Sequence, residues 1–171
     1  KRLCVLDIVP THKLFANTDK AFALGYYHWF FLAQPFDLPE RMIGADPVYF
    51  LDQKLGHWSR SGATFDPRAL AEYRRCFSDP ATIHASCEDY RAAASIDLEH
   101  DAADLAVRLT CPTHVLWGQY GLMHKLFDVS AAWLEMCHSV TGRALPSGHF
   151  LAEEAPSETI AEIRAFLAAD Q

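Results

Sequence analysis

Several sequence features that would define a class of protein at once are missing from this chain of 171 residues. The five cysteines are odd in number and form no Cys-x-x-Cys pair, which argues against a disulfide framework or a zinc site and favours a reducing cytoplasm. The nine histidines form no His-Glu-x-x-His pattern, so we expect no metal. No apolar run approaches the roughly 20 residues of a membrane span, so we expect no membrane partner.

Positive charge is also scarce. The chain has 15 lysines and arginines against 22 aspartates and glutamates, a formal net charge of -7, and no basic stripe. A nucleic acid, with its negatively charged backbone, is therefore not an expected partner. Half of the residues are hydrophobic, which is enough to fill the core of one domain of this length.

The chain opens directly on an apolar run. Residues 3–8 (LCVLDI) predict a strand of a parallel sheet that is buried on both faces, and Pro10 ends it. Asp7 then lies near the carboxyl end of the strand, where catalytic groups of open α/β sheets gather; a capping role is the alternative. Because a buried strand at residue 3 has no upstream partner, we expect the chain to be the C-terminal part of something longer.

Residues 12–105 predict helices only. A helix is expected over 17–34, because apolar residues recur there at intervals of three and four. Its aromatic run 26–31 (YYHWFF) must face two sides, or face a core and a pocket. His28 and Trp29 differ from the neighbouring phenylalanines because each carries an N–H group that needs a partner when it is buried.

The rest of this helical block is punctuated by turn and cap signals. Residues 56–62 predict a loop that carries Trp58. Asp-Pro pairs at 66–67 and 79–80 place an N-cap aspartate before a proline in the first helical turn, and each predicts a helix start. The second of these helices carries Tyr90, and residues 97–109 are expected to continue as helix.

The sheet is predicted to return near the C-terminus. Strands are expected over 113–118 and 140–145, with an amphipathic helix over 124–137 between them and a closing helix from about 156 to 169. The sequence Ser-Gly-His at 147–149 follows the last strand. Glycine there permits a left-handed or tight backbone, which can aim His149 at the sheet edge, and a histidine can move protons near neutral pH. The alternative is a loop histidine with a structural hydrogen bond.

This layout resembles the α/β-hydrolase superfamily, in which a helical cap is inserted between two strands of a parallel sheet. The resemblance implies an α/β fold that corresponds to the C-terminal portion of an α/β hydrolase. Residues 1–11 would form the core strand with the acid of the catalytic triad, 12–105 the cap, and 106–171 the end of the core.

A narrower resemblance is to the haloacetate (fluoroacetate) dehalogenase family. The segments that carry it extend over essentially the whole chain: 5–10 (VLDIVP), 27–34 (YHWFFLAQ), 41–47 (RMIGADP), 89–92 (DYRA), 112–118 (PTHVLWG) and 147–156 (SGHFLAEEAP). Many hydrolases place the triad acid just after the strand at 113–118, but this chain has no carboxylate there before Asp128. An acid from the preceding strand fits Asp7.

The resemblance implies a role for each of these residues. His149 would activate water, Asp7 would orient His149, His28, Trp29 and Tyr90 would bind the departing halide, and Trp58 would line the substrate pocket. The family's nucleophile is an aspartate on a strand-to-helix turn. No Gly-x-Ser-x-Gly or Gly-x-Asp-x-Gly elbow occurs in this sequence, and Arg41, Arg60 and Arg91 do not replace the family's carboxylate-binding arginines. We expect the nucleophile in a missing N-terminal half, and this fragment alone to be inactive.

The implied reaction is hydrolytic dehalogenation of a small 2-haloacid, with no organic cofactor or metal and with a homodimer as the expected assembly. Pocket volume would decide between fluoride and chloride. An epoxide hydrolase that uses Tyr90 as its acid, or an esterase with a serine elbow upstream, is the first alternative. A non-catalytic relative that binds a ligand among the aromatic helices is the second.

Overall fold

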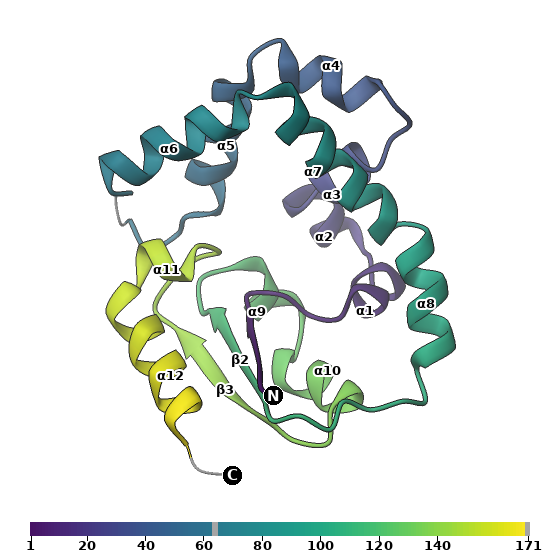
Figure 1. Ribbon diagram of the computed structural model, residues 1–171, viewed down its shortest axis with the longest axis vertical. Helices are drawn as coiled ribbons and strands as arrows, with labels where there is room; N and C mark the ends of the chain where they lie inside the picture. The colour runs from purple at the N-terminus through teal and green to yellow at the C-terminus, as the bar shows by residue number, and fades with distance from the viewer. Residues whose placement is uncertain (63–64, 170–171) are drawn as a thin grey trace.

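The computed structural model describes residues 1–62 and 65–169, which form a three-stranded parallel sheet with helices on both faces (Figure 1). The strands are β1 (Leu3–Leu6), β2 (Thr113–Gly118) and β3 (Val140–Leu145), in the order β1-β2-β3. Leu3 pairs with Thr113, and Thr113 pairs with Val140, so the carboxyl ends of all three strands meet at one edge. The predicted α/β class is confirmed.

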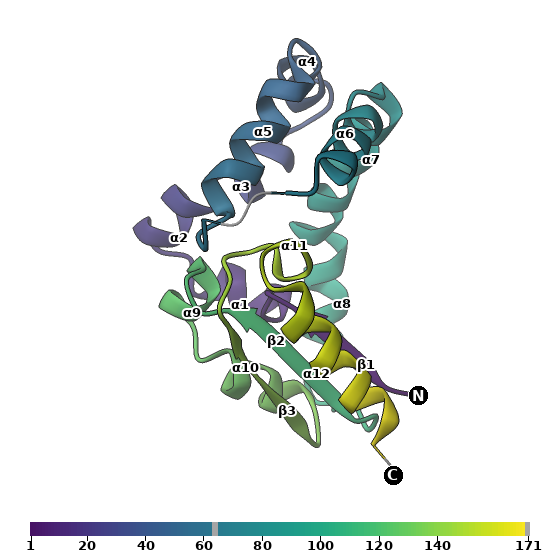
Figure 2. The same ribbon diagram turned by 90° about the vertical axis from the view of Figure 1, so that its left-hand side faces the viewer.

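Most of the helices lie between β1 and β2 in the sequence. They are α1 (Thr11–Ala16), α2 (Lys20–Gly25), α3 (His28–Leu32), α4 (Leu38–Gly44), α5 (Pro47–Trp58), α6 (Pro67–Phe77), α7 (Pro80–Ala93) and α8 (Ile96–Asp104). The remaining helices are α9 (Leu122–Leu126), α10 (Val129–Met136), α11 (Leu151–Glu154) and α12 (Pro156–Ala168). In Figure 2, α3 to α7 form an upper lobe above the sheet.

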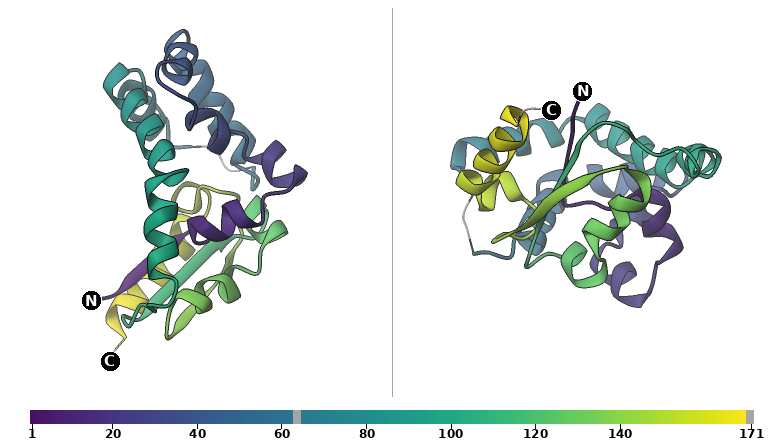
Figure 3. Two further views of the ribbon diagram at one scale, coloured as in Figure 1. Left: turned by 90° about the vertical axis from the view of Figure 1, so that its right-hand side faces the viewer. Right: turned by 90° about the horizontal axis from the view of Figure 1, so that it is seen from below.

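The central strand β2 divides two layers of core. Val115 belongs to a cluster with Val129 and Ala132 of α10, whereas Leu116 packs with Leu151 of α11 and, beyond it, α12. Successive residues of a strand face opposite sides, so this alternation places α10 and α12 on opposite faces, as the view from below in Figure 3 shows. Both faces of β2 are therefore covered.

The upper lobe has a core of its own. Leu32, Ile43, Ile83 and Cys87 are buried together, with Phe31, Phe50, Phe77 and Tyr90 packed around them. The helices α7 and α8 follow one another down the side of the molecule, from this lobe to the level of the sheet (Figure 3). The upper lobe is thus connected to the level of the sheet through the helices α7 and α8.

Three predicted elements differ from the structure. The helix expected over 17–34 is two short helices, α2 and α3, and α2 ends at Gly25, which lies against Leu122. The helix expected over 124–137 is interrupted at Asp128, which caps α10 through the Ala131 amide. The helix expected to reach residue 109 ends at Asp104, after which Leu109 forms a parallel bridge with Cys137.

Two further predictions are corrected. The helix α5 continues through Trp58, so residues 56–58 of the expected loop 56–62 are helical, and the loop begins at Ser59. The strand β1 is not buried on both faces: Leu3, Cys4 and Val5 are half-buried, and Leu6 is 41% exposed. Among the described residues, β1 pairs with β2.

Candidate active site

The structure brings Asp7 and His149 together at the carboxyl edge of the sheet. Asp7 Oδ2 lies 2.6 Å from His149 Nδ1, and Asp7 is 1% exposed. A carboxylate at Nδ1 fixes the tautomer that carries its proton there, which leaves Nε2 as the basic nitrogen. Nε2 makes no hydrogen bond to the described residues, and the His149 side chain is 31% exposed. The pair has the geometry of a general base and its orienting acid.

Asp7 is held in a strained backbone conformation. Its φ is 49°, and it is the one non-glycine residue with a positive φ in the described part of the chain. Asp and Asn tolerate this left-handed region better than other side chains, although at some cost in energy. Asp7 Oδ1 accepts a hydrogen bond of 2.9 Å from the Gly118 amide at the end of β2. The strand therefore aims the carboxylate, and Oδ2 is left for His149.

Glycine allows the loop that carries His149 to pass close to other backbone segments. A Cβ on Gly118 would lie 1.8 Å from the carbonyl oxygen of Gly148, and a Cβ on Gly148 would lie 2.4 Å from that of Trp58. Gly148 does not have a positive φ, so of the two conformations expected for it, left-handed or tight, the left-handed one is not present. Glycine is needed at this position because other backbone segments approach it closely.

The carboxylate of Glu154 holds the loop of His149 in place through hydrogen bonds. Its Oε2 accepts hydrogen bonds of 2.9 Å from the amides of Arg60, Ser61 and Gly148 and one of 2.8 Å from the Ser61 hydroxyl; Oε1 accepts one of 3.1 Å from the Phe150 amide. Burial alone would raise the pKa of Glu154, but these hydrogen bonds, led by the one from Gly148, lower it to about 2. A single carboxylate thus joins the His149 loop to the segment after α5.

Aromatic rings connect His149 to the helices above it. Trp58 lies 5.5 Å from the His149 ring and 4.4 Å from the His28 ring, between centroids. Tyr26 lies 5.9 Å from His149 and 5.3 Å from His28, and its hydroxyl oxygen is 3.3 Å from His149 Nδ1. Burial, and then the negative charge of Asp7, raises the pKa of Tyr26 far above its ordinary value. The Tyr26 hydroxyl is therefore neutral.

The residues predicted to bind halide form a group next to these rings. Tyr90 lies 5.3 Å from both His28 and Trp29, edge-on to each. His28, Trp58 and Tyr90 line a cavity of about 220 Å³, together with Lys54 and Phe150; we call it the His28 cavity. Trp29 does not line it, but packs against Tyr90 from the core side. The predicted site residues thus come from β1, α3, α5, α7 and the loop after β3.

Burial keeps two polar side chains of the His28 cavity, His28 and Tyr90, neutral. Burial, and then electrostatic repulsion by Lys54 and a smaller contribution from the neighbouring His149, lowers the pKa of His28 to about 3. Burial raises the pKa of Tyr90 to about 12, with a smaller contribution from Asp89. Nδ1 of His28 is buried without a hydrogen-bond partner in the described part of the chain. Near pH 7, His28 and Tyr90 are therefore neutral groups that can donate an N–H and an O–H to a bound anion.

Three site residues were not identified from the sequence. In the sequence analysis, Tyr26 is only part of the apolar pattern over 17–34, and Lys54 is not mentioned. Glu154 is only part of the segment 147–156 that resembles the dehalogenase family, and no role is given to it. A polar residue within an apolar helix face was the available signal for Lys54. Glu154 had no such signal, since its partners Arg60 and Ser61 are 94 and 93 positions away.

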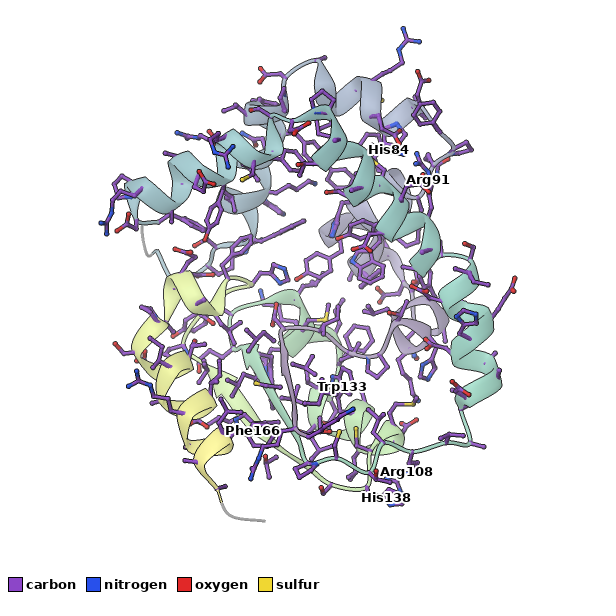
Figure 4. The ribbon with its side chains drawn as sticks, in the orientation of Figure 1. His84, Arg91, Arg108, Trp133, His138 and Phe166 are labelled. Atoms are coloured by element: carbon purple, nitrogen blue, oxygen red, sulfur yellow. The ribbon has the colours of Figure 1, made fainter. Side chains whose placement is uncertain are left out.

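A cluster with metal-ligand chemistry lies elsewhere, in the upper lobe. Glu40, His84 and Glu88 have one ligand atom each within 4.8 Å of one another. The Arg91 guanidinium occupies the same place, with Nη1 2.7 Å from Glu40 Oε1 and 2.5 Å from Glu88 Oε1; Figure 4 shows His84 and Arg91 on α7. The hydrogen bond from Arg91 lowers the pKa of Glu40 to about 2. Arg91 already neutralises the negative charge of this cluster, so we interpret the cluster as an ion-pair network.

Comparisons with known proteins agree with the fold. No protein-family model matches the chain. A fluoroacetate dehalogenase of Burkholderia sp. is 45% identical over 166 residues, which is 96% of this chain and 55% of that protein. A soluble epoxide hydrolase of Corynebacterium sp. (strain C12) is 31% identical over 164 residues, 94% of this chain and 56% of that protein. The chain thus spans about half the length of the curated relatives it matches.

The solved structures give the same assignment. A protein of Nostoc sp. PCC 7120 classed as an α/β hydrolase superposes with a TM-score of 0.96 at 55% sequence identity, over 99% of this chain and 58% of that one. The chain has the α/β-hydrolase fold. Within it, the predicted resemblance to the fluoroacetate and haloacetate dehalogenases is confirmed, and this chain matches the C-terminal part of that family. In the described residues, no helix is long and apolar enough to cross a membrane.

Proposed function

We propose that this chain carries the general base and the halide-binding pocket of a hydrolytic dehalogenase for small 2-haloacids, which converts fluoroacetate to glycolate and fluoride. The observation that carries the proposal is the buried Asp7–His149 pair, 2.6 Å apart, beside the ring group of His28, Trp29 and Tyr90. Because the chain spans about half of the dehalogenase, we infer that a preceding segment supplies the nucleophile and the arginines for the substrate carboxylate.

The first proposed step is a displacement. An aspartate of the preceding segment attacks the carbon next to the substrate carboxylate; a carbon–oxygen ester bond forms, and the halide leaves with the electron pair of the carbon–halogen bond. The departing ion needs donors to replace its hydration. His28, Trp29 and Tyr90 supply N–H, N–H and O–H groups, and the loss of one such donor typically costs about 3 kcal/mol of barrier.

The second proposed step is hydrolysis of the ester. Nε2 of His149 takes a proton from a water molecule, whose oxygen attacks the ester carbonyl carbon of the aspartyl group. The ester bond then breaks, and the leaving glycolate oxygen takes the proton from the His149 imidazolium. The aspartyl carboxyl group loses its proton to solvent, which regenerates the aspartate and the neutral base. Asp7 stabilises the imidazolium that forms, because its carboxylate is buried against the Nδ1–H. Trp58 and Tyr26 fix the plane of the imidazole from two sides.

The test is a trapped intermediate. In the full-length protein, His149→Asn should allow the displacement but not the hydrolysis. Incubation with fluoroacetate should then release up to one fluoride per active site and add the mass of a carboxymethyl group to the protein. Full turnover by this variant, or no fluoride release by the unmodified protein, would contradict the proposal. Trp133→Phe is the matched control and should keep turnover. Among the described residues, the indole N–H of Trp133 donates its hydrogen bond to the Ile8 carbonyl.

A specific observation supports a second function, an epoxide hydrolase. One curated relative is a soluble epoxide hydrolase, and Tyr26 and Tyr90 offer two neutral hydroxyl groups close to His28. A tyrosine could protonate the opening oxygen of an epoxide. Turnover of styrene oxide without fluoride release from fluoroacetate would favour this function. A serine elbow upstream would indicate an esterase instead, and inertness toward all these substrates a ligand-binding relative. A cytoplasmic homodimer is part of the same proposal.

A further inference from the structure

The hydroxyl group of Tyr26 lies beside the nitrogen of His149 that faces Asp7. Tyr26 caps the C-terminal end of α2 and is 4% exposed, and its hydroxyl oxygen is 3.3 Å from Nδ1. Asp7 Oδ2 lies 2.6 Å from the same nitrogen. An ionised carboxylate can only accept a hydrogen bond, so Nδ1 carries the hydrogen and the Tyr26 hydroxyl cannot donate to it. The tyrosine oxygen is therefore a second, longer acceptor for the Nδ1–H.

The hydrogen of the Tyr26 hydroxyl then needs an acceptor of its own. Among the described residues, His149 Nδ1 is the one hydrogen-bonding contact of this hydroxyl, and no carbonyl or carboxylate oxygen accepts from it. The hydroxyl keeps its hydrogen, because burial, and then the negative charge of Asp7, raises the pKa of Tyr26 far above its ordinary value. Buried hydroxyl groups almost always have a partner, either in the protein or in ordered water.

A small cavity next to Tyr26 can supply this partner. It has a volume of about 40 Å³ and is lined in part by Tyr26, His149 and Gly121; we call it the Tyr26 cavity. A polar cavity of this size is large enough for water. A Cβ on Gly121 would lie 3.7 Å from each carboxylate oxygen of Asp7, so this wall of the cavity adjoins Asp7. The cavity therefore lies on the Nδ1 side of the imidazole, away from Nε2.

The Tyr26 cavity is separate from the His28 cavity. Among the described residues, Trp58 is the one residue that lines both. The exposed residues His57 and Arg60 also line the Tyr26 cavity, so a water molecule in it can exchange with the solvent. Water can thus reach the back of the imidazole without passing through the proposed halide pocket.

We propose that Tyr26 is a positioning residue for the base: its hydroxyl oxygen shares the Nδ1–H of His149 with Asp7, while a water molecule in the Tyr26 cavity accepts its hydroxyl hydrogen. This inference rests on the proposed function, in which His149 takes a proton only in the second step. The water molecule turns the lone pairs of the hydroxyl oxygen toward the Nδ1–H. When His149 becomes an imidazolium, this oxygen stabilises the positive charge together with Asp7. The displacement involves no proton transfer, so Tyr26 acts on ester hydrolysis alone.

The test compares the two steps in Tyr26→Phe, which removes the oxygen and keeps the ring against His28 and Trp58. The full-length protein is mixed with fluoroacetate and quenched at short times, and mass spectrometry follows the formation and the loss of the ester. Tyr26→Phe should keep the rate of ester formation within about twofold and slow ester hydrolysis about three- to tenfold, the effect of one hydrogen bond. Tyr49→Phe, which changes an exposed tyrosine on α5, is the control and should leave both rates unchanged.

Two kinetic results would overturn the role of Tyr26. One is ester hydrolysis at the unmodified rate in Tyr26→Phe, and the other is an equal slowing of both steps, which indicates a purely structural role. A crystal structure of the unmodified full-length protein tests the water site without any variant. We expect a water molecule within hydrogen-bond distance of the Tyr26 hydroxyl, and a protein acceptor in its place would contradict the water site.

Styrene oxide, as a second substrate, separates this inference from the proposed function. An epoxide hydrolase would form the same kind of aspartyl ester, and His149 would hydrolyse it. Slower hydrolysis of that ester in Tyr26→Phe, with no fluoride release from fluoroacetate by the unmodified protein, contradicts the dehalogenase and supports the role of Tyr26. Fluoride release with ester hydrolysis that does not depend on Tyr26 supports the dehalogenase and contradicts the role of Tyr26.

Discussion

The backbone amide of His149 donates a hydrogen bond of 3.1 Å to the carbonyl oxygen of Trp58. This bond joins the loop after β3 to the C-terminal end of α5, and the Glu154 carboxylate reinforces it a few residues away on each side. The proposed base and the wall of the proposed halide pocket are therefore one connected unit. A change in this junction should affect both chemistry and substrate binding.

Glu154→Ala should destabilise the protein by about 2–4 kcal/mol, because it leaves the amides of Gly148, Ser61 and Phe150 without their acceptor. Glu154→Gln keeps one acceptor oxygen and should cost less. Urea unfolding at pH 7 measures both. Glu99→Ala, an exposed position on α8, is the control and should change the free energy of unfolding by less than about 0.5 kcal/mol. Equal stabilities of Glu154→Ala and the control would contradict the role of Glu154 in joining the His149 loop to the segment after α5.

Asp7→Asn should lower the turnover of fluoroacetate by the full-length protein about 10³–10⁴-fold while the protein stays folded. The Asn oxygen would keep the hydrogen bond from the Gly118 amide, so its NH₂ group would face His149 Nδ1 and force the proton onto Nε2. Asn also tolerates the positive φ of this position. Turnover within tenfold of the unmodified protein would show that Asp7 does not orient the base. Asp7→Ala, which lacks both advantages, should be less stable than Asp7→Asn.

Lys54→Met should stabilise the protein near neutral pH. Burial lowers the pKa of Lys54 from 10.5 to about 8, so the folded state opposes protonation. The cost is fully present below pH 8 and disappears as the pH rises toward 10.5, because the unfolded chain binds the extra proton in that window. We expect a gain of about 2–3 kcal/mol at pH 7 that shrinks by pH 10. A gain that is constant with pH would contradict the buried charge.

Arg91→Met should destabilise the upper lobe by about 2 kcal/mol at pH 7, since it removes the bidentate partner of the mostly buried Glu40. Arg91 lowers the pKa of Glu40 from 4.5 to about 2. The stabilisation is therefore present above about pH 4.5 and is lost as the pH falls toward 2. Thermal unfolding at pH 7, 5 and 3.5 should show the difference between the two proteins narrowing. Arg68→Met, which removes an exposed ion pair, should show little difference at any pH.

Local signals in the sequence predicted the elements that depend on local chemistry. The strand at 113–118 and the helix starts at Pro67 and Pro80 lie where β-rich composition and Asp-Pro pairs indicated, because caps and turns involve neighbouring residues. The break after Gly25 was not predicted, and neither was the contact of Gly25 with Leu122, nearly a hundred positions away.

The same distinction applies to the site. The family resemblance indicated Asp7, His149 and the halide residues, and the structure places them next to one another. Glu154 acts through Arg60 and Ser61, which are distant in sequence, so neither spacing nor residue type revealed it. For Lys54, which lies beside Phe50 and Trp58 on the same helix, residue type was a signal that was not used. The burial of the Lys54 side chain is a property of the assembled fold.

Asp7 and His149 are 142 positions apart, yet Gly118 governs the placement of both: its amide holds the carboxylate, and its bare Cα admits the Gly148 carbonyl. Of the helices between β1 and β2, α5 also takes part in placing His149, through the Trp58 carbonyl that accepts its backbone amide. Changes in α3 and α7 can therefore alter the molecules accepted with less effect on the proton-transfer pair than changes at the end of α5. Gly118 is the position where drift would be least tolerated, because any side chain there would displace the acid and the base together.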